Sequence, residues 1–428
     1  MAIKSIPLPC ALPGTPLSDL RAGIDTCVHC GFCLQACPTY LTLQDENDSP
    51  RGRIVLMREI LDGTLSPDDL SVRTHFDRCL GCQACETACP SGVPYGHLIE
   101  ATRETIAARH PIPFVARVIL AVFARPRLLA LALAGARLAR AMRLPALLSR
   151  LPGRIGFAMA MLASTRPAVE KRKWTATGSG ARGTTALLTG CVMEGLFTET
   201  NRATERVLVA NDYACTPAPG QRCCGALHAH AGDADTARAL ARANVAAFEA
   251  AATDFIAVNA AGCGAMMKDY GHLLRDDPAW ADRAARVAAK VRDVSELLAA
   301  AGPRQGGTVR ASVTYDAPCH LLHAQRVAMP PLAVLGAARG IALVPLEEAD
   351  QCCGSAGIYN LIEPETSDAV LAPKLHHIAA TGARYVASGN PGCLMQLGAG
   401  LSREGARALA LHPVELLDAA YAAAPPTD

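Results

Sequence analysis

Apolar and polar positions along the chain follow the spacing of both strands and helices. Between residues 184 and 421, short runs rich in apolar and β-branched residues, such as 184–189 and 312–318, predict strands, and alanine-rich stretches such as 236–252 and 370–381 predict helices. Strands and helices that alternate over short loops predict small α/β domains. Nearer the N-terminus, a turn at 48–53 leads into an amphipathic run that predicts a further helix.

The region 184–421 consists of two copies of one pattern. In each copy one cysteine follows the first strand, an adjacent cysteine pair and a glycine lie in a loop, and a fourth cysteine follows a later strand. Corresponding cysteines are offset by 128, 129, 129 and 130 residues, and each copy ends in a similar helix, at 295–298 and 414–417. Open α/β sheets place their sites at strand ends. The sequence therefore predicts two equivalent α/β domains that face each other across a pseudo-twofold axis.

The stretch from Arg109 to Ala163 is apolar and basic, and no acidic residue interrupts it. Its uncharged runs, such as 128–136, are much shorter than the roughly 20 residues that a membrane-spanning helix needs. Two interpretations stay open: short helices in the headgroup plane of an anionic membrane, or linker helices packed on protein. Prolines at 126, 145 and 152 break the stretch into pieces. Its arginines are Arg117, Arg125, Arg127, Arg137, Arg140, Arg143, Arg150 and Arg154.

Composition restricts the class of protein. The 428 residues suit two or three domains, and a net charge of +2 argues against a nucleic-acid partner. The 18 cysteines would suit a disulfide-rich secreted protein, but the N-terminal residues show no apolar signal-peptide core and no twin-arginine pair. Clusters of thiolates need a reducing compartment, so we expect a cytoplasmic protein.

Two cysteine runs near the N-terminus have the spacing Cys-x-x-Cys-x-x-Cys-x-x-x-Cys-Pro. In a two-cluster ferredoxin, three cysteines of a run hold one 4Fe-4S cube, and the fourth reaches the other cube. A zinc site needs only two Cys-x-x-Cys pairs and has no use for a swapped fourth cysteine. The predicted ligand sets are Cys27, Cys30, Cys33 with Cys89, and Cys79, Cys82, Cys85 with Cys37.

Arg51 and Arg53 lie in the turn between the two runs. Bound cubes carry net negative charge, so a nearby guanidinium would raise a reduction potential or pair with a carboxylate of a partner. The alternative is that both arginines are solvated or cap a helix.

The repeat cysteines allow several interpretations. Four thiols in each copy fit a bound metal or a noncubane iron-sulfur cluster, and we favour this interpretation. The alternatives are zinc, a vicinal disulfide, or buried thiols without metal. His228, His230, His320 and His323 lie near these cysteines and are candidates for supporting hydrogen bonds. Cys10 and Cys215 lie outside every pattern. The two sets are Cys191, Cys223, Cys224 and Cys263, and Cys319, Cys352, Cys353 and Cys393.

These motifs together carry a family resemblance. The segments CVHCGFCLQACPTY, DSPRGRI, RCLGCQACETACPSGV, YDAPCHLLHAQ and CCGSAGIYNL, in this order along the chain, resemble the iron-sulfur subunit of bacterial glycolate oxidase. Iron-sulfur subunits of lactate-utilisation and anaerobic glycerol-3-phosphate dehydrogenase systems share the plan. The Cys-Cys-Gly repeats also resemble those of heterodisulfide reductase, but Met266 and Gln396 stand where that enzyme has a further cysteine.

The resemblance implies a complex in which partner subunits that carry FAD oxidise glycolate to glyoxylate. This chain would then transfer electrons through two 4Fe-4S clusters, towards membrane quinone, and would be inactive alone. It implies a peripheral position on the cytoplasmic face of the inner membrane. A self-sufficient disulfide reductase and a zinc-stabilised scaffold are the other classes. The expected domains are 1–108 with both clusters, the linker 109–183, and the Cys-Cys-Gly domains 184–302 and 303–428.

Overall fold

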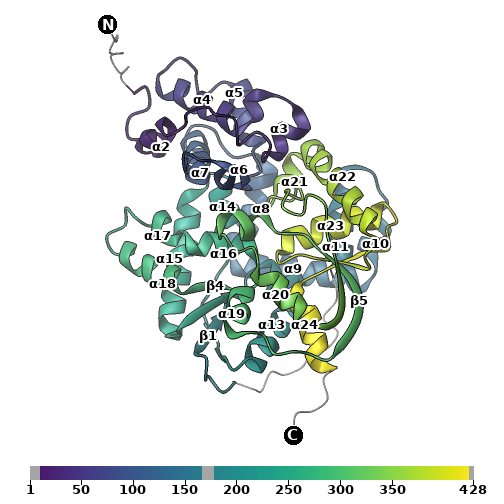
Figure 1. Cartoon of the computed structure of the whole chain (residues 1–428). Coiled ribbons are helices and arrows are strands. Elements are labelled where there is room, and N and C mark those ends of the chain that lie inside the picture. Colours follow the sequence, from purple (N-terminus) through teal and green to yellow (C-terminus); the bar gives the residue numbers. More distant parts are fainter. Residues whose placement is uncertain (1–9, 166–177, 424–428) are drawn as a thin grey trace.

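The computed structural model describes residues 10–165 and 178–423, and it places a helical N-terminal module above two α/β repeats (Figure 1). Apolar side chains such as Leu17, Met57 and Phe76 form the core of the module. Its helices are α1 (Pro16–Asp19), α2 (Arg21–Asp25), α3 (Pro38–Leu43), η1 (Glu46–Asp48), α4 (Pro50–Leu61), α5 (Leu70–Asp77), α6 (Ala84–Ala88) and α7 (Tyr95–Ala107).

Helix α4 forms where the turn and the amphipathic run predict it. The Ser49 hydroxyl accepts a hydrogen bond from the Gly52 amide at 3.0 Å, and Pro50 occupies the first helical position. A β-carbon at Gly52 would lie 1.9 Å from the Glu46 carbonyl oxygen, so this position requires glycine. The first turn of α4 therefore packs tightly against η1.

The basic apolar segment forms four helices that lie along the repeats. These are α8 (Phe114–Ala124), α9 (Pro126–Ala141), α10 (Leu144–Leu148) and α11 (Gly153–Ser164). Among the described residues no single helix is long and apolar enough to cross a membrane; α8 and α9 pass the length and composition test only as a pair bent by 104°. Arg137 of α9 donates hydrogen bonds to the carbonyls of Gly195 (3.0 Å) and Glu194 (2.9 Å). The segment thus packs on both repeats: α9 lies against the first and has no buried residue, and α11 packs on α23 of the second.

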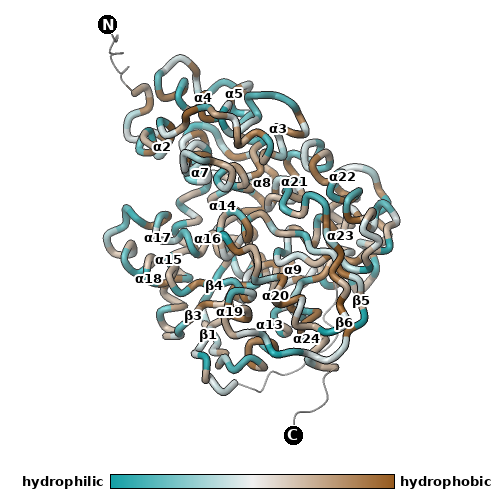
Figure 2. Tube along the Cα trace, in the orientation of Figure 1, coloured by the Kyte–Doolittle hydropathy of each residue, from teal (hydrophilic) through white to brown (hydrophobic). Residues whose placement is uncertain are grey.

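Each repeat is built on a four-stranded parallel sheet, which confirms the predicted α/β class. The strand orders, β2-β1-β3-β4 and β6-β5-β7-β8, are equivalent. Figure 2 shows hydrophobic and hydrophilic residues mixed along the elements of both repeats. The first repeat contains β1 (Thr184–Leu187), α12 (Val192–Leu196), α13 (Thr198–Ala210), β2 (Ala214–Thr216), α14 (Ala226–His230), α15 (Ala234–Ala251), β3 (Phe255–Val258), α16 (Ala261–Lys268), α17 (Tyr270–Leu273), α18 (Ala281–Lys290), β4 (Val291–Asp293) and α19 (Val294–Ala301).

The second repeat has the same order of strands, but a single helix, α23, connects its last two strands where the first repeat has α16, α17 and α18. It contains β5 (Thr308–Tyr315), η2 (His320–Ala324), α20 (Pro330–Gly336), β6 (Arg339–Val344), α21 (Tyr359–Ile362), α22 (Pro364–Thr381), β7 (Tyr385–Ala387), α23 (Pro391–Arg403), β8 (Leu409–Leu411) and α24 (Pro413–Ala422). The predicted helices at 295–298 and 414–417 lie inside α19 and α24.

The two repeats contact each other reciprocally. Helix α13 of the first packs on α24 of the second, and α19 of the first packs on α20 of the second. Because α13 corresponds to α20 and α19 to α24, these two contacts are equivalent under a twofold exchange. Val207, Leu298, Val334 and Leu417 share the apolar core between the repeats. The arrangement agrees with the pseudo-twofold relation that the sequence predicts.

Candidate metal centres

The two N-terminal cysteine runs adopt the same backbone conformation. His29 (φ 55°) and Gly81 (φ 63°) occupy equivalent positions before the second cysteine of each run, and Gly31 (φ 86°) and Gln83 (φ 59°) follow it. All four residues lie in the left-handed region, where side chains other than glycine are uncommon. These alternating conformations curl each loop, so that its first three cysteines face one cavity.

Each loop lines a separate small cavity together with the fourth cysteine of the other run. Cys85 contributes to the walls of both cavities, so it lies between them. We call Cys27, Cys30, Cys33 and Cys89 the outer set, and Cys79, Cys82, Cys85 and Cys37 the inner set. The structure thus brings together the same groups of four that the spacing predicts, and their soft thiolate donors fit iron-sulfur clusters.

The two sets differ in burial. Cys30 of the outer set is exposed and its other members are half-buried, whereas all four cysteines of the inner set are buried. Burial raises the pKa of the Cys33 thiol to about 11. Burial and the charge of neighbouring cysteines raise the pKa of Cys82 and Cys85 well above the ordinary value. Bound iron would compensate this unfavourable crowding of thiolates.

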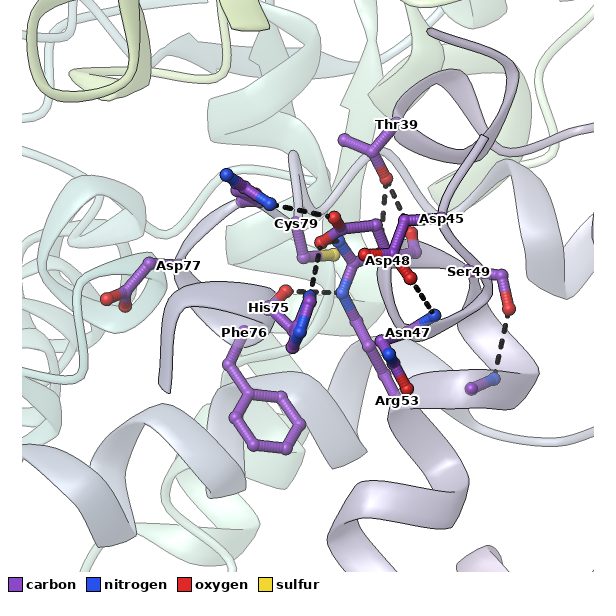
Figure 3. A network of polar contacts seen from close by, with 12 residues as sticks. Thr39, Asp45, Asn47, Asp48, Ser49, Arg53, His75, Phe76, Asp77 and Cys79 are labelled. Atoms are coloured by element: carbon purple, nitrogen blue, oxygen red, sulfur yellow. Dashed lines mark hydrogen bonds and ion pairs between the residues drawn. The ribbon is translucent and has the colours of Figure 1, made fainter. Parts of the chain in front are cut away.

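A buried ion-pair network supports the inner set (Figure 3). The Arg53 guanidinium donates to Asp48 Oδ1 (3.1 Å), to Thr39 Oγ1 (3.2 Å) and to the backbone carbonyl of His75 (2.5 Å). Thr39 Oγ1 lies 3.2 Å from Cys37 Sγ. The Arg78 guanidinium and His75 Nδ1 complete the network at 3.0 and 3.1 Å from the Asp48 carboxylate. A fully buried ion pair, Arg53 with Asp48, therefore lies directly beside the inner cysteines.

The structure also separates the roles of the two arginines in the 48–53 turn. Arg51 lines the cavity of the outer set, and its Nε donates to Glu46 Oε1 at 2.6 Å. Arg53 lines the cavity of the inner set and is fully buried, so it is neither solvated nor a helix cap. Asp45, Asp48 and His75 bring oxygen and nitrogen atoms close enough for a metal ion. Both carboxylate oxygens of Asp48 already accept from cationic groups, which explains this cluster without a metal.

The repeat cysteines converge at equivalent points of the two sheets. In the first repeat Cys191 follows β1 and Cys263 lies in the first turn of α16, after β3. Strands β1 and β3 are neighbours whose connections leave in opposite directions, the usual position of a site in an open α/β sheet. Cys191 Sγ lies 3.7 Å from Cys223 Sγ, and Cys224 Sγ lies 3.3 Å from Cys263 Sγ.

The second repeat reproduces this set of four thiols. Cys352 raises the pKa of Cys319, and Cys352 and Cys393 raise the pKa of Cys353, well above the ordinary value of a thiol in both cases, because the four thiols lie close together. In both repeats thiol hydrogen bonds lower the pKa of the first cysteine of the adjacent pair, Cys223 or Cys352, well below its ordinary value. Since the two adjacent cysteines bond to different partners, each site is a chain of four sulfurs rather than an isolated vicinal pair.

The glycine after each cysteine pair has a steric role. Gly225 and Gly354 have φ of 93° and 82°, and a β-carbon at Gly354 would lie 2.6 Å from the Ser367 carbonyl oxygen. In the first repeat Asn244 Nδ2 donates to the Cys223 carbonyl at 3.0 Å, and the Tyr270 hydroxyl donates to the Cys224 carbonyl at 2.8 Å. No motif in the sequence marked Asn244 or Tyr270 as supports of the site.

The second repeat lies directly against the inner set. Cys352 and Tyr359 share one apolar cluster with Leu80 and Cys82, and Cys319 packs against it. The Tyr359 hydroxyl donates to the Arg78 carbonyl at 2.9 Å. After burial, the charge of Cys352 is the next cause that raises the pKa of Cys82. The two cysteine sites are therefore immediate neighbours.

The site of the first repeat faces α9 of the basic apolar segment, whereas α11 of this segment shares an apolar cluster with Cys353 and Cys393 of the second repeat. A cavity of about 290 Å³ is bounded by Cys191 and Cys223 on one side and by Leu129, Leu133 and Arg137 of α9 on the other. The two repeat sites are thus equivalent in fold and different in surroundings.

The four histidines bind the N-terminal module and α8, and their described hydrogen bonds do not involve cysteine sulfur. His228 Nε2 lies 3.1 Å from the Leu120 carbonyl, and His230 Nδ1 lies 2.8 Å from Glu100 Oε1. His320 Nε2 lies 3.0 Å from the Gly81 carbonyl, and His323 Nδ1 lies 3.0 Å from Thr87 Oγ1. These side chains position the repeats against the module.

Known families match the same three parts of the chain. The family described as 4Fe-4S dicluster domain matches residues 23–93, and the family described as cysteine-rich domain matches residues 185–268 and 313–398. The fold, the two cysteine runs and the repeat thus agree with the matched domains.

Whole-length relatives extend this agreement. The chain is 37% identical to the probable glycolate oxidase iron-sulfur subunit of Bacillus subtilis, over 91% of this chain and 92% of that protein. It is 33% identical to the glycolate oxidase iron-sulfur subunit of Escherichia coli, over 89% and 90%. It is 29% identical to lactate utilization protein A of Geobacillus kaustophilus, over 55% of this chain and 98% of that protein. The chain therefore belongs to the family of glycolate oxidase iron-sulfur subunits and is an iron-sulfur electron-transfer subunit of an oxidoreductase complex.

Proposed function

We propose that this chain carries electrons from FAD-bearing partner subunits, which oxidise glycolate to glyoxylate, to membrane quinone. The observation that supports this most strongly is the succession of cysteine sites. The outer set is partly exposed, the inner set is buried, and the second repeat site packs against the inner set. Electron-transfer rates fall steeply with distance, so neighbouring sites of this kind form an efficient route through the protein.

The outer and inner sets are the proposed ligands of two 4Fe-4S clusters. Each bound cluster would accept and release one electron. The polypeptide holds four thiolates around each cavity, excludes water from the inner set and places the Arg53 charge beside it. Arg53 and Arg78 together exceed the Asp48 carboxylate by one positive charge, and a net positive charge favours the reduced form of a cluster, so we expect the inner cluster to have the higher potential. Electrons then flow inward from the surface.

The outer set is the proposed contact for the flavin partner. Cys30 is exposed, and the exposed side chains of Val28 and Phe32 flank it in the same loop. Exposed apolar residues beside a redox site favour docking of another protein surface. A partner seated there would bring its flavin close to the outer set.

A metal or cluster is also the proposed occupant of each repeat site. Four sulfur donors in a connected chain form a soft donor set that fits iron or zinc. Metal analysis of protein purified without oxygen distinguishes the two, because zinc without extra iron would make these sites structural.

The chain is proposed to work as a peripheral protein on the cytoplasmic face of the inner membrane. Helices α8 and α9 expose Phe114, Val118 and Leu131 together with Arg117 and Arg127. A face that is apolar and basic suits the headgroup region of an anionic bilayer. Replacing Arg117 and Arg127 by Glu tests this, because release from anionic vesicles is expected and unchanged binding would contradict it.

The test of the proposed function uses the chain reconstituted with its flavin subunits. Cys79→Ser removes a ligand of the inner set, and Cys10→Ser is the control because Cys10 lies outside every site. We expect both variants to retain glycolate oxidation with a dye that reacts at the flavin. Glycolate-dependent reduction of ubiquinone-1 should be lost in Cys79→Ser alone. Equal quinone reduction without this chain would overturn the proposal.

Lactate is the alternative substrate, because lactate utilization protein A is also a relative. The flavin partner decides between the two hydroxyacids, so the same reconstituted complex is assayed with each. A heterodisulfide reductase activity is less well supported, since Met266 and Gln396 lack the thiolate of that enzyme and both side chains are buried.

A further inference from the structure

A cavity of about 310 Å³ lies where the N-terminal module, the start of α8 and the two repeats meet. Its walls are mainly apolar and come from α5, α7, the 110–116 segment, α14 and the loop after Cys353. Its size and lining are typical of a site for a small organic molecule. The apolar wall residues include Leu80, Ile106, Ile112, Leu227, Ile358 and Tyr359.

Two redox sites border this cavity. Cys79 of the inner set lies on its wall, and Leu80 and Tyr359 connect the wall to Cys82 and Cys352 through one apolar cluster. A molecule in the cavity would therefore be close to both the inner set and the second repeat site. Such a position suits an electron acceptor better than a structural lipid.

Titratable and charged groups also reach the cavity. His230 and His110 line it, held by Glu100 and Asp68 at 2.8 Å each. The Arg103 guanidinium donates to the carbonyls of Cys79 (2.5 Å) and His230 (3.0 Å) at the same wall. The histidines, which can exchange protons, thus lie close to the cysteine sites proposed to carry electrons. A reaction that consumes both protons and electrons requires this arrangement.

The wall of the cavity continues along the chain into α8, a helix that also has an exposed apolar face. Pro111, Ile112, Pro113 and Ala116 form part of its wall, and this stretch leads directly into that helix. Phe114, Val115 and Val118 are 71%, 55% and 47% exposed, and Arg117 lies among them. A ligand with a long hydrocarbon chain could place its polar ring in the cavity and its chain along this face.

We propose that this cavity binds the ring of a membrane quinone. The inference rests on the proposed function, and it adds the position of the acceptor site and the groups that supply protons. Glycolate releases two electrons and two protons on becoming glyoxylate. Two electrons reach the quinone from the cysteine sites, one at a time, and two protons reach its oxygens from solvent through His110 and His230. The quinone becomes the quinol, and the electrons and protons balance.

The experiment measures binding to this chain alone, purified with its clusters and without oxygen. Ubiquinone-1 and menadione are titrated by equilibrium dialysis, and an arylazido ubiquinone is photolysed and its labelled peptides identified. Leu227→Trp fills the cavity from α14, and Ile358→Trp fills it from the second repeat. Leu409→Trp is the control, because Leu409 is 52% exposed on β8 and does not line the cavity.

We expect the two cavity-filling variants to weaken quinone binding about tenfold or more, while Leu409→Trp leaves it unchanged. Iron content and the paramagnetic signals of the reduced clusters should be equal in all variants, which shows that folding is intact. Label should appear in peptides from 70–80, 103–116 or 356–363. Equal binding in both filled variants, no binding to the parent chain, or label confined to the cavity beside α9 would each overturn the inference. Quinone binding is measured without a flavin partner. Its outcome therefore does not depend on whether electrons pass from the flavin to the clusters, as the proposed function requires.

Discussion

Replacing Asp48 by Asn tests whether the buried ion pair supports the inner cysteine set. The Asp48 carboxylate is fully buried and accepts from Arg53, His75 and Arg78. Asparagine keeps the size of the side chain but removes its charge and one acceptor oxygen, and its amide group would face a guanidinium. Arg53 is only 1% exposed, so water cannot replace the lost carboxylate.

The magnitude follows from this burial. Removing one partner of a buried ion pair costs about 3–5 kcal/mol, because the remaining charge stays buried without compensation. The Arg78 contact adds little, since that side chain is about one-third exposed. With a urea dependence of about 1–3 kcal/mol per molar, the unfolding midpoint should fall by about 1 M or more.

The assay follows the iron-sulfur absorbance of the purified protein in urea without oxygen. Asp45→Asn is the matched control, because it removes the same charge from the same segment, where Asp45 Oδ1 only accepts from the Asn47 amide at 2.9 Å. We expect the free energy of unfolding of this control to change by no more than about 0.5 kcal/mol. If Asp48→Asn and Asp45→Asn unfold at the same urea concentration, the Arg53 pair does not stabilise the module and the reasoning is wrong.

Three further predictions concern the repeats and the metal. Gly354→Ala should lower the free energy of unfolding in urea clearly more than Gly382→Ala. Both glycines have positive φ, but only at Gly354 would a β-carbon lie 2.6 Å from a carbonyl oxygen. Equal losses of stability would contradict the steric argument. Burial lowers the pKa of His412 to about 4, so the unfolded state binds more protons as the pH falls from about 6.5 towards 4, and stability should drop by about 3 kcal/mol over that range. His412→Gln should flatten this dependence and His376→Gln, at an exposed position, should preserve it; an unchanged slope in His412→Gln would refute the assignment. Removing iron with a chelator should expose residues 10–107 to protease before the repeats, because thiolates crowded without iron repel one another, and equal resistance of apo and holo protein would count against this.

The cysteine sets were predictable because their signals are local or periodic. A Cys-x-x-Cys-x-x-Cys loop specifies its own curl, and the exchanged fourth cysteine follows from the pairing of two such runs. A repeat offset of about 129 residues likewise specifies two copies of one fold. The assignment of each cysteine to a cluster stays a prediction until iron is measured.

Other features depend on tertiary packing and have no signature in the sequence. The sequence does not distinguish Arg51 from Arg53. In the structure, helix α4 directs Arg53 into the module and leaves Arg51 near the surface. Asn244 and Tyr270 donate hydrogen bonds to the carbonyls of the cysteine pair of the first repeat, although they lie 21 and 46 residues further along the chain. The contact of Tyr359 with Arg78 spans 281 residues, and no local pattern encodes it.

The position of the module explains why two equivalent repeats have different surroundings. The module contacts both repeats, but only one of the two equivalent cysteine sites can lie beside its single inner set. His320 and Tyr359 join the second repeat to the inner set, whereas the site of the first repeat faces α9. If both repeat sites hold the same metal, their distance from the inner set should make only the second one a fast electron carrier. The first would then serve stability or a slower exchange, and a variant of Cys352 should affect electron transfer more than the same change at Cys223.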